Sequence, residues 1–348
     1  MRLLIFINII WLIFAPIPYA AASSSEDVNA RYISMALQGD LSRAGQLFAE
    51  ADMDNETAAA AELAVRFRSR FVDRREKLSP ESGDTLIDAI ITTYREYWTD
   101  ELMRPSADGE GDDALEHRVN ELLHPDQTGL SEEHQVSAFA RLGNALQDRG
   151  FFYLEAEASP LRDLFLWKQE ETKNYDVRLT DTTQPVSVTF MREIYSLGWK
   201  EFATLGLVST TGWVDGDRLY CISWAYDRES ENFKISYLKH EARHLADLKR
   251  YPSLSSADLE YRAKLTELAF ASNTMHRLLD DFTSKSAPNP SSPHAWANFR
   301  VVRDVYRSLY SMPVPDDGDP WVNVNPNAVA RTARTLLEQN TASQNLQD

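Results

Sequence analysis

Residues 233–270 read FKISYLKHEARHLADLKRYPSLSSADLEYRAKLTELAF. The first six residues are rich in branched and aromatic side chains, which favour a strand. A helical pattern follows over residues 239–250, and a second helix is expected over residues 256–281, after a turn at Tyr251 and Pro252. The sequence therefore predicts two helices that a tight turn brings together in antiparallel order.

The first of these helices contains HEARH at residues 240–244. Two histidines four residues apart lie on one face of a helix, so His240 and His244 can bind the same Zn²⁺ ion through their imidazoles. Glu241 projects about 100° further around the helix. In that position Glu241 is expected to act as a general base that takes a proton from water beside the metal. It is not expected to be a metal ligand.

A catalytic zinc site keeps one position open, so a third protein ligand is needed. Glu260 and Glu267 lie about 20° apart on one face of the second helix. Glu260 is the predicted ligand because it lies about one turn into that helix, whereas Glu267 is about 10 Å further along the axis. Glu267 is the alternative ligand, and its other expected role is an ion pair with a basic neighbour.

The HExxH motif followed by Glu260 on the next helix resembles the gluzincin group of zinc metallopeptidases. The resemblance covers residues 233–270 and implies a zincin-like helix pair, a Zn²⁺ cofactor and a peptide or protein substrate. Two features depart from the group. Glu260 follows His244 by 16 residues, a shorter spacing than in the best-known members, and Lys264 occupies a position where an acidic residue often follows the glutamate.

Other residues are weaker candidates for roles at this site. Asp247 is the nearest acid in sequence that can accept a hydrogen bond from a ligand histidine, and a solvated helix acid is the alternative. Residues 209–213, STTGW, can form an edge beside which a substrate extends, or simply a turn packed by an aromatic ring. Four residues are candidate donors to an oxyanion: Tyr237, Tyr261, His276 and His294.

The remaining histidines and the single cysteine offer no second site. His117, His124 and His134 lack partner spacing, and Cys221 lies in an apolar segment typical of a buried small residue. The sequence has neither a Gly-x-Ser-x-Gly elbow nor a Walker loop, which excludes the common serine-hydrolase and nucleotide-binding classes.

Composition and net charge exclude further classes of function and of metal site. The chain has 348 residues, 43% of them hydrophobic and 26% charged, so it can bury a substantial core. Its formal net charge is −17, which repels phosphate backbones and excludes nucleic acid as a general partner. One cysteine cannot supply a thiolate zinc cluster, so histidine and carboxylate must hold any metal.

The first 22 residues have the pattern of a cleavable signal peptide. Arg2 precedes an apolar run of about 15 residues, and Ala20 and Ala22 form an Ala-x-Ala site. An uncleaved membrane anchor is the alternative, but the run is shorter than the 20 or so residues that span a bilayer. No second stretch is apolar enough to span, so we expect a periplasmic or secreted protein.

The N-terminal half has a helical pattern after the signal. Helices are expected over residues 58–71, 86–102 and 131–150, and residues 106–113 are expected to form a loop. Asp84 and Ser131 are the predicted caps of the second and third helices, which Pro105 and Gly150 end.

After Gly150 the pattern changes to a small β region. Strands are expected at residues 177–179, 186–190 and 219–224. A loop over residues 284–294, a helix over residues 296–310 and a last short helix over residues 328–337 follow the active-site pair.

The fold expected is α+β and mostly helical, with a small antiparallel β region before the helix pair. Its predicted parts are a signal peptide (1–22), a helical region (23–150), a zincin-like catalytic region (151–310) and a polar tail with a short helix (311–348). The predicted function is that of an exported zinc-dependent hydrolase, expected to act on peptides. The rival prediction is a non-catalytic exported helical scaffold or binding protein whose HExxH motif is coincidental or decayed.

Overall fold

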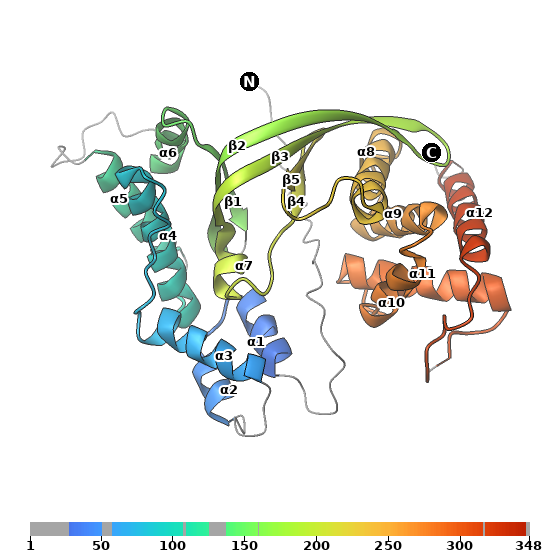
Figure 1. Ribbon diagram of the computed structural model, residues 1–348, viewed down its shortest axis with the longest axis horizontal. Helices are drawn as coiled ribbons and strands as arrows, with labels where there is room; N and C mark the ends of the chain where they lie inside the picture. Colours follow the sequence, from blue (N-terminus) through green and yellow to red (C-terminus); the bar gives the residue numbers. More distant parts are fainter. Residues whose placement is uncertain are drawn as a thin grey trace. The chain divides into compact units, whose positions relative to one another are not determined.

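The protein is mostly helical and contains one β-sheet. It is described by a computed structural model that is 56% helical with a mixed sheet, which confirms the mostly helical α+β class (Figure 1). No helix in the described part of the chain is both long and apolar enough to cross a membrane. The predicted signal segment, 1–22, lies outside the residues that the structure describes, which are 28–50, 58–106, 109–124, 137–158, 160–315 and 317–345.

The chain divides into two compact units. The first contains the residues up to Glu171 together with Met191–Trp213. The second contains Thr172–Phe190 and everything from Val214 onward. The HExxH motif and both glutamates of the predicted helix pair belong to the second unit.

Within the described residues, the sheet has the strand order β1-β2-β3-β5-β4. Phe152 of β1 lies opposite Trp167 of β2 in an antiparallel pair. A tight turn joins β2 to β3, where the Leu179 amide donates a hydrogen bond to the Thr182 carbonyl oxygen (2.8 Å). The strands are β1 Phe152–Ala158, β2 Leu161–Arg178, β3 Thr183–Leu197, β4 Gly212–Asp215 and β5 Arg218–Ile222.

β2 and β3 extend well beyond the apolar segments from which they were predicted, whereas β5 ends at Ile222, before the predicted end at residue 224. Residues 186–190 lie inside β3, residues 219–222 lie in β5, and only residues 177–178 of the first segment are the end of β2. The middle of β2, residues 168–176, is KQEETKNYD and largely exposed, so hydrophobic patterning does not reveal it as a strand.

The first unit is mostly helical. Asp84 caps α4 by accepting hydrogen bonds from the amides of Leu86 (2.9 Å) and Ile87 (3.2 Å), which confirms that predicted start. The expected helix over residues 58–71 is present as α3 continued by η1, a short π-helical segment. The helices are α1 Val28–Leu37, α2 Ala44–Glu50, α3 Ala58–Phe67, η1 Arg68–Val72, α4 Thr85–Met103, α5 Glu110–Leu123, α6 Ala138–Gln147 and α7 Gly198–Ala203.

The second unit packs its helices around α9. This helix contacts α8, α11 and α12, and every residue from Leu259 to Ala269 is buried. Its side chains therefore sit away from water, including the charged ones. The helical elements are η3 Asn232–Lys239, α8 His240–Arg250, α9 Ser256–Phe270, α10 Met275–Ser284, α11 Pro293–Tyr310 and α12 Pro326–Gln344.

The strand expected at residues 233–238 is wrong, because these residues form the π-helical segment η3. Phe233 lies against four aromatic rings at centroid distances of 5.6–6.1 Å, and the Tyr237 hydroxyl donates to the Tyr220 carbonyl oxygen (2.9 Å). Tertiary packing thus overrides the strand propensity of branched and aromatic residues.

The single helix expected over residues 256–281 is also wrong, since it is broken between α9 and α10. Glu231 accepts hydrogen bonds from the amides of Ser272 (2.5 Å), Asn273 (3.0 Å) and Thr274 (3.3 Å). A carboxylate from a distant part of the chain stabilises this turn, which contains neither glycine nor proline.

Three further boundaries differ from the predictions. The expected loop over residues 106–113 ends early, because α5 begins at Glu110 with three acids in its first turn. The last helix, α12, is longer than the expected 328–337 and buries Val329, Ala330, Ala333 and Leu337. The described part of the expected helix 131–150 is α6, capped by Ser137, while Ser131 lies outside the described residues.

Candidate metal centre

His240 and His244 lie one turn apart at the start of α8. The side chains are buried, and their Nε2 atoms are 3.0 Å apart. The helix begins directly after η3, so there is no loop before His240. η3 is an eight-residue π-helical segment, and π-helical geometry is rare in proteins and frequent at functional sites. Here the aromatic packing of η3 fixes the start of the helix that carries both imidazoles.

Glu260 of α9 completes a group of three potential ligands. Its Oε1 atom lies 3.0 Å from the His244 Nε2 atom and 3.4 Å from the His240 Nε2 atom. The carboxylate is fully buried. The turn between α8 and α9 is short enough to bring this early position of α9 opposite both imidazoles.

The separations among these three atoms fit a zinc ion. In a tetrahedral site with bonds of about 2.0 to 2.1 Å, neighbouring ligand atoms are about 3.3 Å apart. The measured edges of the triangle are 3.0, 3.0 and 3.4 Å. Two histidines and one carboxylate are also a known ligand set of catalytic zinc, which leaves a fourth position for water or substrate.

Glu267 occupies a different place from Glu260. Its Oε1 atom lies 2.7 Å from the His240 Nδ1 atom, on the side of the ring away from the three potential ligand atoms. A carboxylate at this nitrogen orients the imidazole and makes the opposite nitrogen a better ligand. Of the two glutamates considered from the sequence, the geometry places Glu260 at the candidate metal position and Glu267 behind His240.

The two carboxylates also control the protonation of His240. Burial lowers the pKa of the imidazole, but Glu260 and Glu267 outweigh burial and raise that pKa to about 10. Burial likewise raises the pKa of Glu260, yet His240 and Lys264 hold it well below its ordinary value. The metal-free cluster is therefore an ion pair with a proton on histidine, and a bound metal takes the place of that proton.

His294 and Lys264 lie at the second oxygen of Glu260. The His294 Nδ1 atom is 2.9 Å and the Lys264 Nζ atom is 3.5 Å from Glu260 Oε2. The shortest contacts with the two imidazoles are thus made by Oε1, and those with His294 and Lys264 by Oε2. His294 was a candidate oxyanion donor in the sequence, whereas its contact with Glu260 had no sequence signal because 34 residues separate them.

Glu241 is buried next to the cluster but outside the triangle of potential ligands. Burial raises its pKa, and the charges of His240 and His244 act in the opposite direction. Its Oε2 atom accepts no hydrogen bond from any described residue. A buried carboxylate with a raised pKa and an unused oxygen is suited to accept a proton from a nearby molecule.

Asp247 does not contact either histidine. It is buried between two arginines, Arg243 (2.5 Å) and Arg262 (2.7 and 2.9 Å), and so ties α8 to α9. Arg243 also donates to Asp181 on the turn between β2 and β3 (2.6 Å). The i, i+4 spacing of Arg243 and Asp247 was the sequence signal for this pair.

The other candidates from the sequence have different contacts or are exposed. The Tyr237 and Tyr261 hydroxyls contact the Tyr220 carbonyl oxygen and Asp304 Oδ2, and His276 is exposed on α10. Burial raises the pKa of the Cys221 thiol to about 12, so it is not a thiolate nucleophile. Of the segment 209–213, Gly212 and Trp213 begin β4, the last strand in the sheet order.

His117 is exposed near Glu121, and His124 ends α5. His134 lies outside the described residues. Among the described residues, His240, His244 and Glu260 form a group of metal-ligating side chains whose ligand atoms lie within 4.8 Å of one another.

No protein-family model, curated protein or solved structure matches this chain.

Proposed function

We propose that this chain is an exported zinc-dependent hydrolase that cleaves peptide bonds. The observation that carries the proposal is the buried triangle formed by His240, His244 and Glu260, whose edges of 3.0 to 3.4 Å fit tetrahedral zinc. Export rests on the signal-like segment 1–22, which suits a periplasmic or secreted enzyme.

Each residue of the cluster has a separate task in this reaction. His240, His244 and Glu260 would hold Zn²⁺, which when bound acidifies water and polarises a substrate carbonyl. Glu241 takes a proton from the attacking water and delivers it to the departing amine. Glu267 keeps the His240 ring in place, and His294 with Lys264 keeps the second oxygen of Glu260 turned away from the imidazoles.

The substitution Glu241→Gln tests the role of the base. Glutamine has the same shape but cannot accept the proton, so hydrolysis should fall by about 10²- to 10⁴-fold while zinc content stays unchanged. The measurement is cleavage of a mixture of internally quenched peptides, with and without a chelator. Glu338→Gln, an exposed change on α12, is the matched control.

If the Glu241→Gln protein hydrolyses the peptide mixture as fast as the parent does, another group is the base. A folded parent chain that binds zinc yet cleaves no peptide, ester or amide would favour the scaffold over the enzyme.

A further inference from the structure

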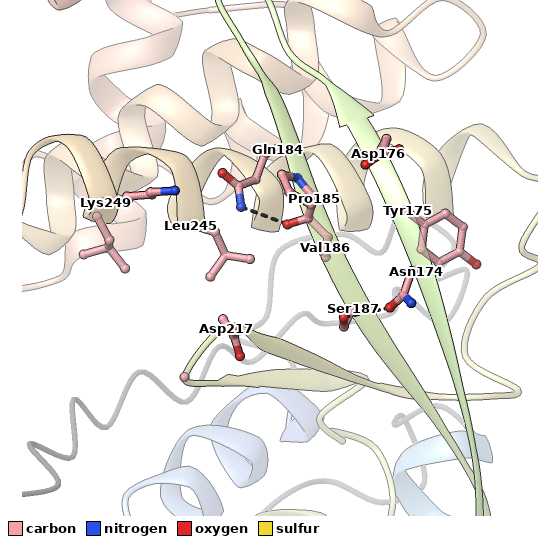
Figure 2. A pocket seen from close by; sticks show the side chains of 12 residues that line it. Asn174, Tyr175, Asp176, Gln184, Pro185, Val186, Ser187, Asp217, Leu245 and Lys249 are labelled. Carbon is pink, nitrogen blue, oxygen red and sulfur yellow. Dashed lines mark hydrogen bonds between the residues drawn. The ribbon is translucent and has the colours of Figure 1, made fainter. Parts of the chain in front are cut away.

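A groove of about 660 Å³ lies along α8 in the second unit, on a part of the helix that the metal cluster does not use (Figure 2). Its walls come from α8, from the β2–β3 hairpin and from the turn between β4 and β5. This volume is within the range of about 300 to 1,000 Å³ that is typical of ligand sites.

The groove shares a helix face with Glu241. Leu245 and Leu248 line the groove and follow Glu241 by four and seven residues. They therefore lie within about 40° of Glu241 around the helix, and about 6 and 10 Å further along its axis. On α8 the groove lining thus begins at Leu245, one helical turn beyond the buried candidate base, and continues toward the C-terminal end of the helix.

The lining combines apolar side chains with two aspartates. Leu245 and Leu248 of α8 line the groove together with Pro185 and Val186 of β3, and these side chains supply apolar surface. Figure 2 shows Asp176 on β2 and Asp217 on the turn between β4 and β5. Both aspartates are exposed, and Lys249 is the only lining residue with a positive charge. The groove is therefore net acidic, in a chain that carries a formal charge of −17.

We propose that this groove binds the part of a peptide substrate next to the cleaved bond and selects segments that carry basic side chains beside an apolar one. The proposal rests on the hydrolase function proposed above. An extended peptide advances about 3.3 Å per residue. With its cleaved bond beside Glu241, its second and third residues from that bond reach Leu245 and Leu248, and lysine or arginine side chains reach Asp176 and Asp217.

The test measures binding separately from catalysis. The Glu241→Gln full-length chain is titrated into two fluorescein-labelled decapeptides that share one apolar sequence, one with two lysines and one with two glutamates. Fluorescence anisotropy should show at least tenfold tighter binding of the lysine peptide. Because this preference is electrostatic, it should shrink as the salt concentration rises.

Charge reversal identifies the groove as the source of the preference. The double substitution D176K/D217K should abolish or reverse it. D317K/E338K changes the net charge by the same amount at exposed positions of the second unit outside the groove lining, and should leave the preference intact. All four positions are exposed, so both proteins should fold; circular dichroism checks this.

Equal affinity of the Glu241→Gln chain for the two peptides would overturn the proposal. A preference for the lysine peptide that survives D176K/D217K, or that disappears in D317K/E338K, would also overturn it. The proposed function fails separately. A zinc-loaded chain that binds the lysine peptide through both aspartates but never cleaves it refutes the hydrolase and keeps the groove, whereas cleavage without charge preference refutes the groove alone.

Discussion

Glu260 and Glu267 share one face of α9 but make different contacts. Seven residues separate them, so they differ by about two helical turns along the axis. Glu260 reaches both imidazole Nε2 atoms, while Glu267 reaches only the Nδ1 atom of His240. The distance along the helix therefore separates a potential ligand from a carboxylate that orients a ligand.

The substitution Glu267→Gln should weaken zinc binding without removing the site. Glutamine keeps the size of the side chain but loses the charge that favours a strongly donating His240, so the zinc dissociation constant should rise about 10- to 100-fold. Competition with a chromogenic chelator measures it, with Glu338→Gln as the control. An unchanged constant would mean that Glu267 forms only a structural ion pair.

At the residue scale, helical spacing alone relates His240 to His244, and the structure places their Nε2 atoms 3.0 Å apart. The position of Glu260 could also be predicted, since a short turn between the two helices brings the start of α9 near the histidines of α8. The contacts of Glu260 with His294 and of Asp247 with Arg262 could not, because they depend on how α9 packs against other helices. No local pattern encodes such contacts.

Elements with their own end signals were predictable, and those whose ends depend on distant residues were not. Asp84 directly precedes α4 and caps it, so the start of that helix could be predicted from the local sequence. The end of α9 is different, since Glu231 of another segment binds the following turn. The π-helical form of η3 likewise depends on rings from distant parts of the chain.

Gly198, at the start of α7, is an element-scale constraint in the first unit. Its φ is +83°, and a Cβ atom there would lie 2.1 Å from Asp163 Oδ1. That oxygen accepts a hydrogen bond from the Trp199 amide (2.8 Å). The glycine therefore permits both the backbone conformation and the close approach of a buried carboxylate.

The substitution Gly198→Ala should lower the free energy of unfolding by about 2 to 4 kcal/mol, through left-handed strain and through the clash with Asp163. Gly83→Ala is the matched control, because its φ is +85° and its added Cβ would meet no atom within 4 Å. The difference between their urea unfolding midpoints isolates the clash. Equal losses in the two variants would contradict this account.

At the scale of the whole molecule, the pH dependence of the free energy of unfolding should reveal the buried carboxyl of Asp163. Burial raises its pKa to about 7, against about 3.9 in an unfolded chain. Between these values the folded state holds a proton that the unfolded state has released. The contribution of this group therefore favours folding most at acidic pH, declines as pH rises from about 4 to about 7, and is constant above that.

The substitution Asp163→Asn should remove this contribution while keeping an oxygen for the Trp199 amide. Relative to the variant, the parent should lose stability between about pH 4 and about pH 7, by up to about 1.4 kcal/mol per pH unit. Urea unfolding of both proteins at the two pH values measures this. Parallel pH profiles would show that Asp163 ionises normally.

The class of fold followed from composition and periodicity, but the extent of the sheet did not. The exposed middle of β2 is polar, so its pairing with β3, and not its own hydrophobic pattern, makes it a strand. The C-terminal segment shows the same limit, since α12 is mostly polar in sequence yet buries four residues. Tertiary contacts define both elements.

Zinc stoichiometry is the most direct measurement of the central claim. The purified parent chain is incubated with zinc, dialysed and analysed by mass spectrometry of the metal, alongside His240→Ala, Glu260→Ala and the control His276→Ala. One zinc per chain is predicted for the parent and the control, with the metal lost from the other two variants. A folded parent that retains no zinc, or a His240→Ala variant that retains one per chain, would contradict the account.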